Sequence, residues 1–491
     1  MKKVQFVDKH VTVTPEGDFT IQDNEYTIDI TPRPVKLGVM VVGLGGNNGS
    51  TLVAGLLAHR NNVSWNTTQG PQTVKFYGSM SQCGSVHIGY DVEGNPHSRL
   101  YKDVSDMCHP DDIVVGGWDI CKDNLYQAAI KAKVIDYNLM SKLQRELTDI
   151  IPLPSIYNPD FIATNQAPRA TNVISQGPLG LRGLVDHVVA DISTFRDTHQ
   201  VDKVVVLWCA STERFNHGKW TTKEDLEEAL DEGDPEISPS ILFAIAAAQA
   251  GCIFLNGSPQ NTLCPAVIAH AHHHGTHVGG EDFKTGQTKI KSVLADWLVT
   301  GGIKPLSIVS YNHLGNNDGK NLDEAPQFRS KEITKKNVID DVVAENPTLF
   351  PDGEAPDHSV VIKYIPAVGD SKRAMDEYYS ELFLGGRHTL SMHNTCEDSL
   401  LAVPIIIDII LFADLFSRLQ VSSNGAEPQP FDTVLSLLSL FFKAPVTNWG
   451  EPLVNAFFRQ KTSIESLFRI LMGLPPANHL YLGQRTRDPD S

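Results

Sequence analysis

Four lysines have surroundings that suit them to chemistry. Lys443 stands in the apolar run "LFFKAP", where loss of hydration lowers an ammonium pKa and favours proton transfer. Lys331 and Lys335 are four residues apart in "RSKEITKK", so on a helix they share one face, although such a pair alone more often forms a solvated basic surface. Lys372 lies in the polar loop "GDSKR". A local pocket of such lysines could hold a small anionic substrate.

A glycine-rich turn follows an apolar stretch, in "VMVVGLGGNNGSTL" (39–52). A dinucleotide-binding turn needs glycine for a tight bend, for close approach of the pyrophosphate and for helix packing. Gly43 and Gly45 meet the first two needs, but Asn48 takes the third place and Gly49 follows one residue late. The pattern alone is weak evidence, because a structural turn has similar glycines. Its place between a predicted strand and a predicted helix favours nucleotide binding.

The acid that usually holds the adenine ribose is missing from the end of the next predicted strand, "TVKFYGS" (73–79). The nearest acid at a predicted strand end is Asp119, in "VVGGWDI" (114–120). Taken alone, Asp119 is more often a cap for a following helix.

The elements that must position these residues alternate along the chain. Apolar strands are predicted at 36–43, 112–120, 202–211 and 252–258, and helices at 49–60, 123–147 and 240–251. This alternation predicts an α/β fold with a parallel, doubly wound sheet. After about residue 285, strands with polar ends indicate an inserted α+β domain. Long apolar helices are expected at 398–420 and 432–443, joined by a mobile linker at 422–430.

Length, charge and cysteine content restrict the class of protein. The 491 residues suggest two or three domains, and the net charge of −17 disfavours a nucleic-acid partner. The seven scattered cysteines contain no Cys-x-x-Cys pair and favour a reducing compartment. No signal peptide is expected, and the apolar segment from Leu400 carries Pro404, Asp408 and Asp414, which favours a buried helix over a membrane span. We therefore expect a cytoplasmic protein without a membrane partner.

Eight longer motifs, taken together, carry a resemblance to one family. They are "GLGGNNGSTL" (43–52), "GWDI" (117–120), "NGSPQNT" (256–262), "GEDFKTGQTK" (280–289), "SYNHLGNNDGKNL" (310–322), "FRSKEI" (328–333), "GDSKRAMDEYYSEL" (369–382) and "CEDSLLAVPIIID" (396–408). In these motifs, which run in order from about residue 35 to 473, the sequence closely resembles myo-inositol-1-phosphate synthases of the eukaryotic type.

The resemblance implies a redox-neutral isomerase that converts D-glucose 6-phosphate to 1D-myo-inositol 3-phosphate. In that family the sugar is oxidised at C5 by NAD, the ketone acidifies the C6 protons, the enolate closes onto the C1 aldehyde, and the hydride returns to C5. The resemblance also implies a Rossmann-like NAD-binding fold, a homotetramer, no divalent metal, and activation by ammonium or another monovalent cation.

By the same resemblance, each lysine has an implied role. Lys331 would shuttle the proton at the C5 oxygen, Lys335 and Lys372 would hold the phosphate, and Lys443 would stabilise the oxyanion at C1. Lys372 is also a candidate for handling the enolisation proton. Further catalytic or substrate-binding positions implied by the motifs are Asp282, Asn312, Asn316, Asp318 and Asp398. Without the resemblance, "NHLGNNDG" would be a turn, and each carboxylate a cap or a solvent-facing charge.

The resemblance also implies the NAD site and places Asp119 at the adenosine ribose. The expected cofactor-binding residues are Gly43, Leu44, Gly45, Gly46, Asn47, Asn48, Asp119, Ser155, Ile156, Gln166, Arg169, Ala210, Ser211, Thr212, Gly257, Ser258, Asp282, Thr285, Asn316, Asn317, Asp318, Gly369, Asp370 and Asp398.

Four segments are expected: a β extension (1–34), an NAD-binding domain (35–288), a catalytic and tetramerisation domain (289–400), and C-terminal helices that return to the NAD-binding domain (401–491). The histidine run "HAHHHGTH" (270–277) departs from the family pattern. His270 and His274 are four residues apart and could bind zinc. We favour an exposed helix end and predict no metal site.

Two alternatives to the isomerase differ in their product. A sugar-phosphate dehydrogenase on the same fold would release NADH, but simple hydride transfer needs one acid or base rather than four lysines. A catalytically silent NAD-binding homologue would have no need to retain every expected lysine and pocket acid.

Overall fold

A parallel sheet forms the centre of the molecule. The structure is a computed structural model that describes residues 2–174, 177, 179–448, 450–478 and 480. Among these residues the sheet order is β12-β11-β10-β3-β8-β9, and every neighbouring pair is parallel. The strands are β3 (Leu37–Val42), β8 (Ile113–Asp119), β9 (Leu153–Pro154), β10 (Lys203–Trp208), β11 (Ile253–Asn256) and β12 (Val278–Gly279). This confirms the predicted doubly wound α/β fold.

Strand β3 is buried on both faces, as its uninterrupted apolar run predicts. Leu37, Val39 and Val41 pack into the core that contains α1 (Asn47–Arg60) and α14 (Asp398–Phe416). Met40 and Val42 face the opposite core. The helices of that second core are α6 (Gly180–His199) and α8 (Pro239–Gln249).

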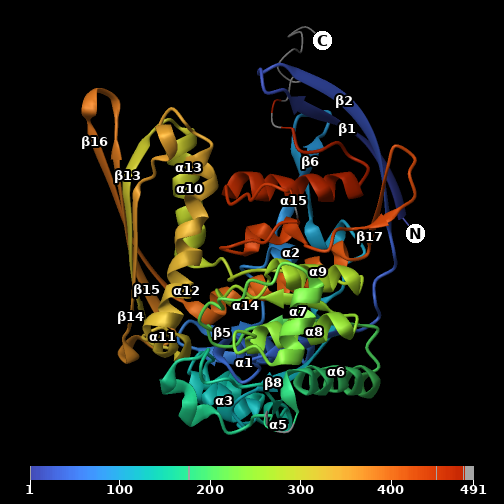
Figure 1. Cartoon of the computed structure of the whole chain (residues 1–491), viewed down its shortest axis with the longest axis vertical. Coiled ribbons are helices and arrows are strands. Elements are labelled where there is room, and N and C mark those ends of the chain that lie inside the picture. Colours follow the sequence, from blue (N-terminus) through green and yellow to red (C-terminus); the bar gives the residue numbers. More distant parts are fainter. Residues whose placement is uncertain (1, 175–176, 178, 449, 479, 481–491) are drawn as a thin grey trace.

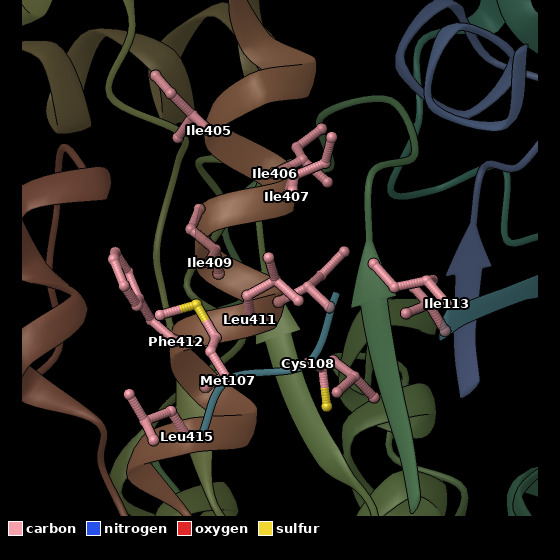
Figure 2. Close-up of a cluster of buried hydrophobic side chains, with 14 of the residues drawn as sticks. Met107, Cys108, Ile113, Ile405, Ile406, Ile407, Ile409, Leu411, Phe412 and Leu415 are labelled. Carbon is pink, nitrogen blue, oxygen red and sulfur yellow. The ribbon is translucent and has the colours of Figure 1, made fainter. Parts of the chain in front are cut away.

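Helix α14 is the apolar segment that the sequence predicted to be buried. By length and composition it is the one helix of the described residues that could cross a membrane, yet most of it lies inside the protein. Figure 2 shows its side chains Ile406, Leu411 and Phe412 in the hydrophobic cluster that also holds Ile113 of β8. Its buried Asp408 accepts hydrogen bonds from the start of the short helix α2 (Met80–Cys83). The prediction of a core helix is confirmed.

The order of the strands creates a crevice in the middle of the sheet. From β3 the chain passes to β8 and β9 on one side, and then returns to β10 on the other side of β3. Ligands of open α/β sheets bind at such a reversal, outside the carboxyl ends of the strands. The glycine turn follows β3 at this point, and residues 209–212 follow β10.

A second, four-stranded sheet stands beside the first, in the order β14-β13-β15-β16. Its strands are β13 (Lys304–Leu314), β14 (Asp357–Tyr364), β15 (Ser371–Glu381) and β16 (Arg387–Glu397). Helices α10 (Gly286–Thr300), α12 (Ala325–Lys336) and α13 (Asp340–Ala344) cover one face, as Figure 1 shows. The other face exposes Tyr311 and Met375. The predicted α+β insertion is therefore present, whereas its boundaries at 288 and 400 stay predictions.

Two elements predicted in the first half of the chain were wrong. Residues 74–79 are not a strand: β5 (Gly70–Thr73) ends before them, and among the described residues it pairs with β4 (Ser64–Thr67) alone. The expected helix at 123–147 is three helices, α3 (Leu125–Ala132), α4 (Tyr137–Lys142) and α5 (Gln144–Asp149). Helix α3 ends because Lys133 adopts a left-handed conformation, with φ of 54°.

Two predictions near the C-terminus were also wrong. Residues 432–443 form a 3₁₀ turn, η8 (Ser436–Phe441), followed by extended chain, so Lys443 is not on a helix. The expected linker at 422–430 overlaps the end of β17 (Leu419–Ser423) and contains β18 (Gln429–Pro430). These extend the sheet of β1 (Lys2–Val13) and β2 (Phe19–Ile30). A turn at Asn424 and Gly425, which have φ of 50° and 76°, lies in the loop between these two strands. Residues 481–491 of the predicted C-terminal segment lie outside the described residues.

Candidate active site

A cavity of about 760 Å³ opens at the crevice between β3 and β10 and continues to the second sheet. Most residues predicted from the sequence line it. They are Gly43, Gly45, Gly46, Asn47, Asn48, Asp119, Ser155, Ile156, Arg169, Ala210, Ser211, Thr212, Gly257, Ser258, Asp282, Thr285, Asn312, Asn316, Asn317, Asp318, Lys331, Gly369, Lys372, Asp398 and Lys443. The remaining four, Leu44, Gln166, Lys335 and Asp370, are buried behind this lining.

The glycine turn leaves room for a ligand close to the backbone. Gly43 has φ of +89°, and a Cβ at this position would lie 2.7 Å from the Cα of Ala210 across the crevice. A Cβ on Gly49 would lie 2.3 Å from the carbonyl oxygen of Leu44, so Gly49 permits the close start of helix α1. It therefore has the packing role of the third fingerprint glycine. The first turn of α1 points its free N–H groups into the cavity, which fits a pyrophosphate.

Asp119 lies where the missing ribose acid should be. Its strand, β8, is the direct neighbour of β3, although a long excursion separates the two in sequence. One carboxylate oxygen accepts the Gly45 N–H at 2.9 Å, and the other accepts the Cys121 N–H at 2.9 Å. Burial raises the pKa of Asp119, while Arg169 opposes that rise. The residue is therefore part of the nucleotide crevice rather than only a helix cap.

Asn47 and Asn316 tie the glycine turn to the second sheet through Asp370. Their side-chain amides donate to the Asp370 carboxylate at 3.1 and 3.0 Å. The same carboxylate accepts the backbone N–H and hydroxyl of Ser399, at the start of α14. On the adenosine side, Gln166 accepts from Arg169 at 3.1 Å and from Asn317 at 3.0 Å. These bonds hold both halves of the cavity wall together.

A short antiparallel ribbon carries the two groups at the centre of the sugar end. Residues 281–284 pair with residues 441–444: the Lys443 N–H donates to the Asp282 carbonyl and the Lys284 N–H to the Phe441 carbonyl, both at 2.7 Å. Asp282 and Lys443 lie opposite each other in this ribbon, and both line the cavity. Lys284 is buried outside the cavity lining and donates to Asn455 at 3.1 Å.

Asp282 holds two lysines with one oxygen. Its Oδ1 accepts from Lys331 Nζ at 2.8 Å and from Lys443 Nζ at 2.9 Å, and its Oδ2 accepts from the Thr334 hydroxyl at 2.7 Å. Burial opposes ionisation of Asp282, but the two ammonium groups outweigh it and lower its pKa. Because the two lysines share this one buried carboxylate, its negative charge stabilises the charged form of each lysine less than it would stabilise one lysine alone.

The two lysines respond to this shared partner in opposite directions. Burial disfavours the charged form of Lys331, but Asp282 and Asp318 outweigh burial and raise its pKa. For Lys443, burial dominates and lowers the pKa to about 7, although Asp282 opposes the shift and Lys331 adds to it. At neutral pH Lys331 therefore stays protonated, whereas Lys443 can still take up a proton.

The two lysines assigned to the phosphate differ in their partners. Lys372 Nζ lies 3.3 Å from Asp398 Oδ1 in the cavity wall. Burial raises the pKa of Asp398, but three lysines lower it by more, so the net change is a decrease. Lys335 is fully buried and donates to Gln287 and Asn312, both at 3.0 Å. Burial, followed by repulsion from Lys372, holds the pKa of Lys335 well below its usual value.

Sequence reasoning missed the polar groups that support these side chains. They are Thr334, Ser399, Gln287 and Asp376, together with the buried Lys284 and Lys291. Of these residues only Thr334 could have been predicted from the sequence, because it lies three residues after Lys331 on the same helix face. The others become neighbours of the site only through the tertiary fold.

The histidine run is only partly an exposed helix end. His270 and His277 are buried, while His272, His273 and His274 are exposed. Burial lowers the pKa of His270 to about 4, with His274 adding to the shift. Over the described ranges, no group of three or more ligating side chains is close enough to hold a metal ion.

The fold and the site define a class first. A doubly wound sheet with a glycine turn at its reversal, joined to a lysine-lined cavity, is an NAD-binding α/β enzyme with an added catalytic sheet. The sequence model of one family of NAD-binding proteins, described as myo-inositol-1-phosphate synthase, matches residues 37–469 of this chain. The chain therefore belongs to the myo-inositol-1-phosphate synthase family, as the resemblance of its motifs implied.

Relatives and solved structures agree with this family. An inositol-3-phosphate synthase of Dictyostelium discoideum is 48% identical over 487 residues, which are 98% of this chain and 94% of that protein. Inositol-3-phosphate synthase 1 of Homo sapiens is 51% identical over 464 residues, covering 94% and 82%. The crystal structure of inositol-3-phosphate synthase from Caenorhabditis elegans superposes with a TM-score of 0.95 at 45% identity, covering 100% of this chain and 96% of that one.

Proposed function

We propose that this enzyme converts D-glucose 6-phosphate to 1D-myo-inositol 3-phosphate with bound NAD and no net oxidation. The observation that carries the proposal is the Asp282 carboxylate, which holds Lys331 and Lys443 together at the sugar end of the nucleotide cavity. Relatives that cover almost the whole chain at about half identity are inositol-3-phosphate synthases. When bound, NAD supplies the hydride acceptor for C5 and the hydride donor that later restores it.

The lysine pair manages the proton of the C5 hydroxyl. Lys331 contacts the C5 oxygen, and the proton released during oxidation enters the Lys331–Lys443 pair, which has room for it because the pKa of Lys443 is about 7. The pair then carries two positive charges. When C5 is reduced again, Lys331 returns a proton to the same oxygen, so the pair ends as it began.

The doubly charged pair also assists ring closure. Loss of a C6 proton gives an enolate, and its attack on the C1 aldehyde places negative charge on the C1 oxygen. Lys443 is then an ammonium fixed by Asp282 beside that oxygen, and stabilises it without waiting for solvent to reorganise. The substrate phosphate, held by Lys372 next to Asp398, takes the C6 proton, and one proton returned to the C1 oxygen forms the new hydroxyl, so no proton is gained or lost overall.

The phosphate lies between Lys335, Lys372 and the start of helix α10. Thr285 precedes α10 and lines the cavity, so the free N–H groups of this helix end add to the two lysines. Asn312 and Asn316 bind sugar hydroxyls. Asp318 and Asp398 complete the wall around the sugar and the nicotinamide.

One assay separates this function from its alternatives. The enzyme is incubated with glucose 6-phosphate and substoichiometric NAD, and products are followed by phosphorus NMR together with NADH absorbance. Inositol phosphate without accumulated NADH supports the proposal. Accumulated NADH would indicate a sugar-phosphate dehydrogenase, and no turnover would indicate a silent homologue.

Assembly and location follow from the same proposal. The uncovered face of the second sheet, with exposed Tyr311, Val361 and Met375, supports a homotetramer built through this face. The free cysteines support a reducing cytoplasm, and activation by ammonium or another monovalent cation stays a prediction from the family. The four-segment division of the chain is likewise proposed. Size measurement by light scattering tests the tetramer.

A further inference from the structure

A buried polar layer lies behind Lys335, between the second sheet and its helices. Three strands contribute to it: His358 from β14, Asn312 from β13 and Asp376 from β15. Helix α10 contributes Gln287 and Lys291 from the opposite side. Of these five residues only Asn312 lines the cavity, so the layer supports the site without forming its surface.

Gln287 links Lys335 to Asp376. Lys335 Nζ donates to the Gln287 carbonyl oxygen at 3.0 Å, and the Gln287 amide nitrogen donates to Asp376 Oδ1. A carboxylate only accepts hydrogen bonds, so it forces the NH₂ of Gln287 toward itself and the oxygen toward Lys335. Tyr378 donates to the other oxygen of Asp376 at 3.5 Å. The direction of the amide is thus set by Asp376.

Asp376 is also the negative charge of this layer. Lys291 lies against His358, with 2.8 Å between Nζ and Nε2, and burial keeps that imidazole neutral by lowering its pKa to about 2. Burial lowers the pKa of Lys291 to about 8, and Asp376 opposes that shift. Besides Asp376 and His358, the titratable groups around Lys335 are Lys291 from α10, Lys331 from α12, Lys372 from β15 and Lys443 from the extended ribbon. All four are lysines, so the negative charge that Lys335 reaches in this layer is Asp376, through Gln287.

We propose that Asp376 is a positioning residue for substrate phosphate binding, acting on Lys335 through the side-chain amide of Gln287. This inference rests on the proposed function, since it assigns Lys335 to the phosphate. With Asp376 in place, the Nζ of Lys335 is held by two oxygen acceptors directly behind the cavity wall, one of them on Asn312, which lines the cavity. Without it, the amide of Gln287 is free to turn its NH₂ toward Lys335, where two donors repel.

The first test is Asp376→Asn, which keeps the shape of the side chain and removes its charge. The KM for glucose 6-phosphate should rise about tenfold, the effect of losing one hydrogen bond to a charged group. The Kd of inorganic phosphate should rise in parallel, while kcat changes less and the Kd of NAD stays unchanged. An unchanged KM and phosphate Kd in this variant would overturn the proposal.

A double variant separates positioning from general loss of packing. The double variant Gln287→Glu, Asp376→Asn exchanges the two groups. The carboxylate is then at position 287, next to Lys335, and the amide at position 376 can donate a hydrogen bond to that carboxylate. This pair should recover most of the substrate KM, whereas Gln287→Glu alone places two carboxylates together and should not. A purely structural role would make the double variant worse than either single one, and that result would overturn the proposal.

Two further variants complete the test. Tyr378→Phe removes the hydroxyl contact but leaves the Asp376 charge, so the KM should remain that of the wild type. If Asp376→Asn does not fold, Gln287→Met breaks the same link from its middle and should raise KM by a similar factor; no rise would contradict the inference. Absence of inositol phosphate from the wild-type enzyme would instead refute the proposed function, so the two failures are distinguishable.

Discussion

The nucleotide end and the sugar end of the cavity are lined by different kinds of chemical group. Around the glycine turn, the nucleotide end consists of backbone and neutral groups: the turn at Gly43, the start of α1 and the loop after β10. Beyond the turn, Asp119 accepts two backbone N–H groups, and Asp123 and Arg169 also line the cavity. The sugar end consists of buried charge, with Lys331 and Lys443 on Asp282 and Lys372 on Asp398.

This difference separates binding from chemistry. Backbone N–H groups and close packing recognise a pyrophosphate in the same way before and after hydride transfer, so they provide affinity. Buried lysines with shifted pKa values change their charge during the reaction, so they provide rate. Substitutions at the nucleotide end should therefore change mainly the Kd of NAD, and substitutions at the sugar end mainly the rate.

The largest effect should come from Lys331→Ala. Cyclisation should fall by a factor on the order of 10³, because one proton-transfer group and half of the Asp282 pair are lost. The Kd of NAD, measured by fluorescence titration, should stay near the wild-type value. Lys443→Ala should behave alike, and a near-normal rate in either variant would refute the assignment of the pair.

The converse variant is Gly43→Ala. Its Cβ would lie 2.7 Å from the Ala210 backbone at a φ of +89°, so the turn must shift where the pyrophosphate binds. The Kd of NAD should rise roughly 100-fold, equivalent to about 3 kcal/mol of lost binding. At saturating NAD much of kcat should return. If NAD affinity survives this change, the turn is not the cofactor site.

A third test uses pH. The pair accepts the C5 proton only while Lys443 is neutral, and its pKa in the free enzyme is about 7. Below that value Lys443 is already protonated, so kcat/KM should fall about tenfold for each pH unit. The substrate phosphate titrates near pH 6. An acid limb at about 6 alone, with no change through 7, would contradict the role given to the pair.

The smallest effect concerns a lysine that shares the ribbon but lies outside the cavity lining. Burial lowers the pKa of Lys284 from 10.5 to about 7, so between these values the unfolded chain binds more protons than the folded one. The free energy of unfolding should therefore rise with pH across this window. Lys284→Met should reduce that slope by at most about 1.4 kcal/mol per pH unit, measured by urea titration. An unchanged slope would show that Lys284 is not neutral when buried.

The same contrast explains what the sequence could predict. The nucleotide turn is one contiguous segment between a strand and a helix, so its motif was readable. The ribose acid was harder to place, because the strand expected at 73–79 is not formed and β8 becomes the neighbour of β3. Asp119 was assigned through family resemblance rather than through the order of the strands.

The sugar end draws its residues from distant segments. The lysines were found through their motifs, but nothing local showed that Asp282 and Lys443 share a ribbon, and residues 432–443 were expected to be helical. Gln287 and Asp376 lie 89 positions apart and meet only because α10 packs on the second sheet. Such contacts depend on tertiary packing, which periodicity does not encode.

The central claim is that C5 gives up a hydride and receives the same one back. Glucose 6-phosphate deuterated at C5 tests it, with NAD far below the substrate concentration and the product analysed by NMR and mass spectrometry. We expect inositol phosphate that retains the deuterium on the carbon derived from C5, with no accumulated NADH. Loss of the label to solvent, or deuterated NADH formed in step with substrate loss, would contradict it.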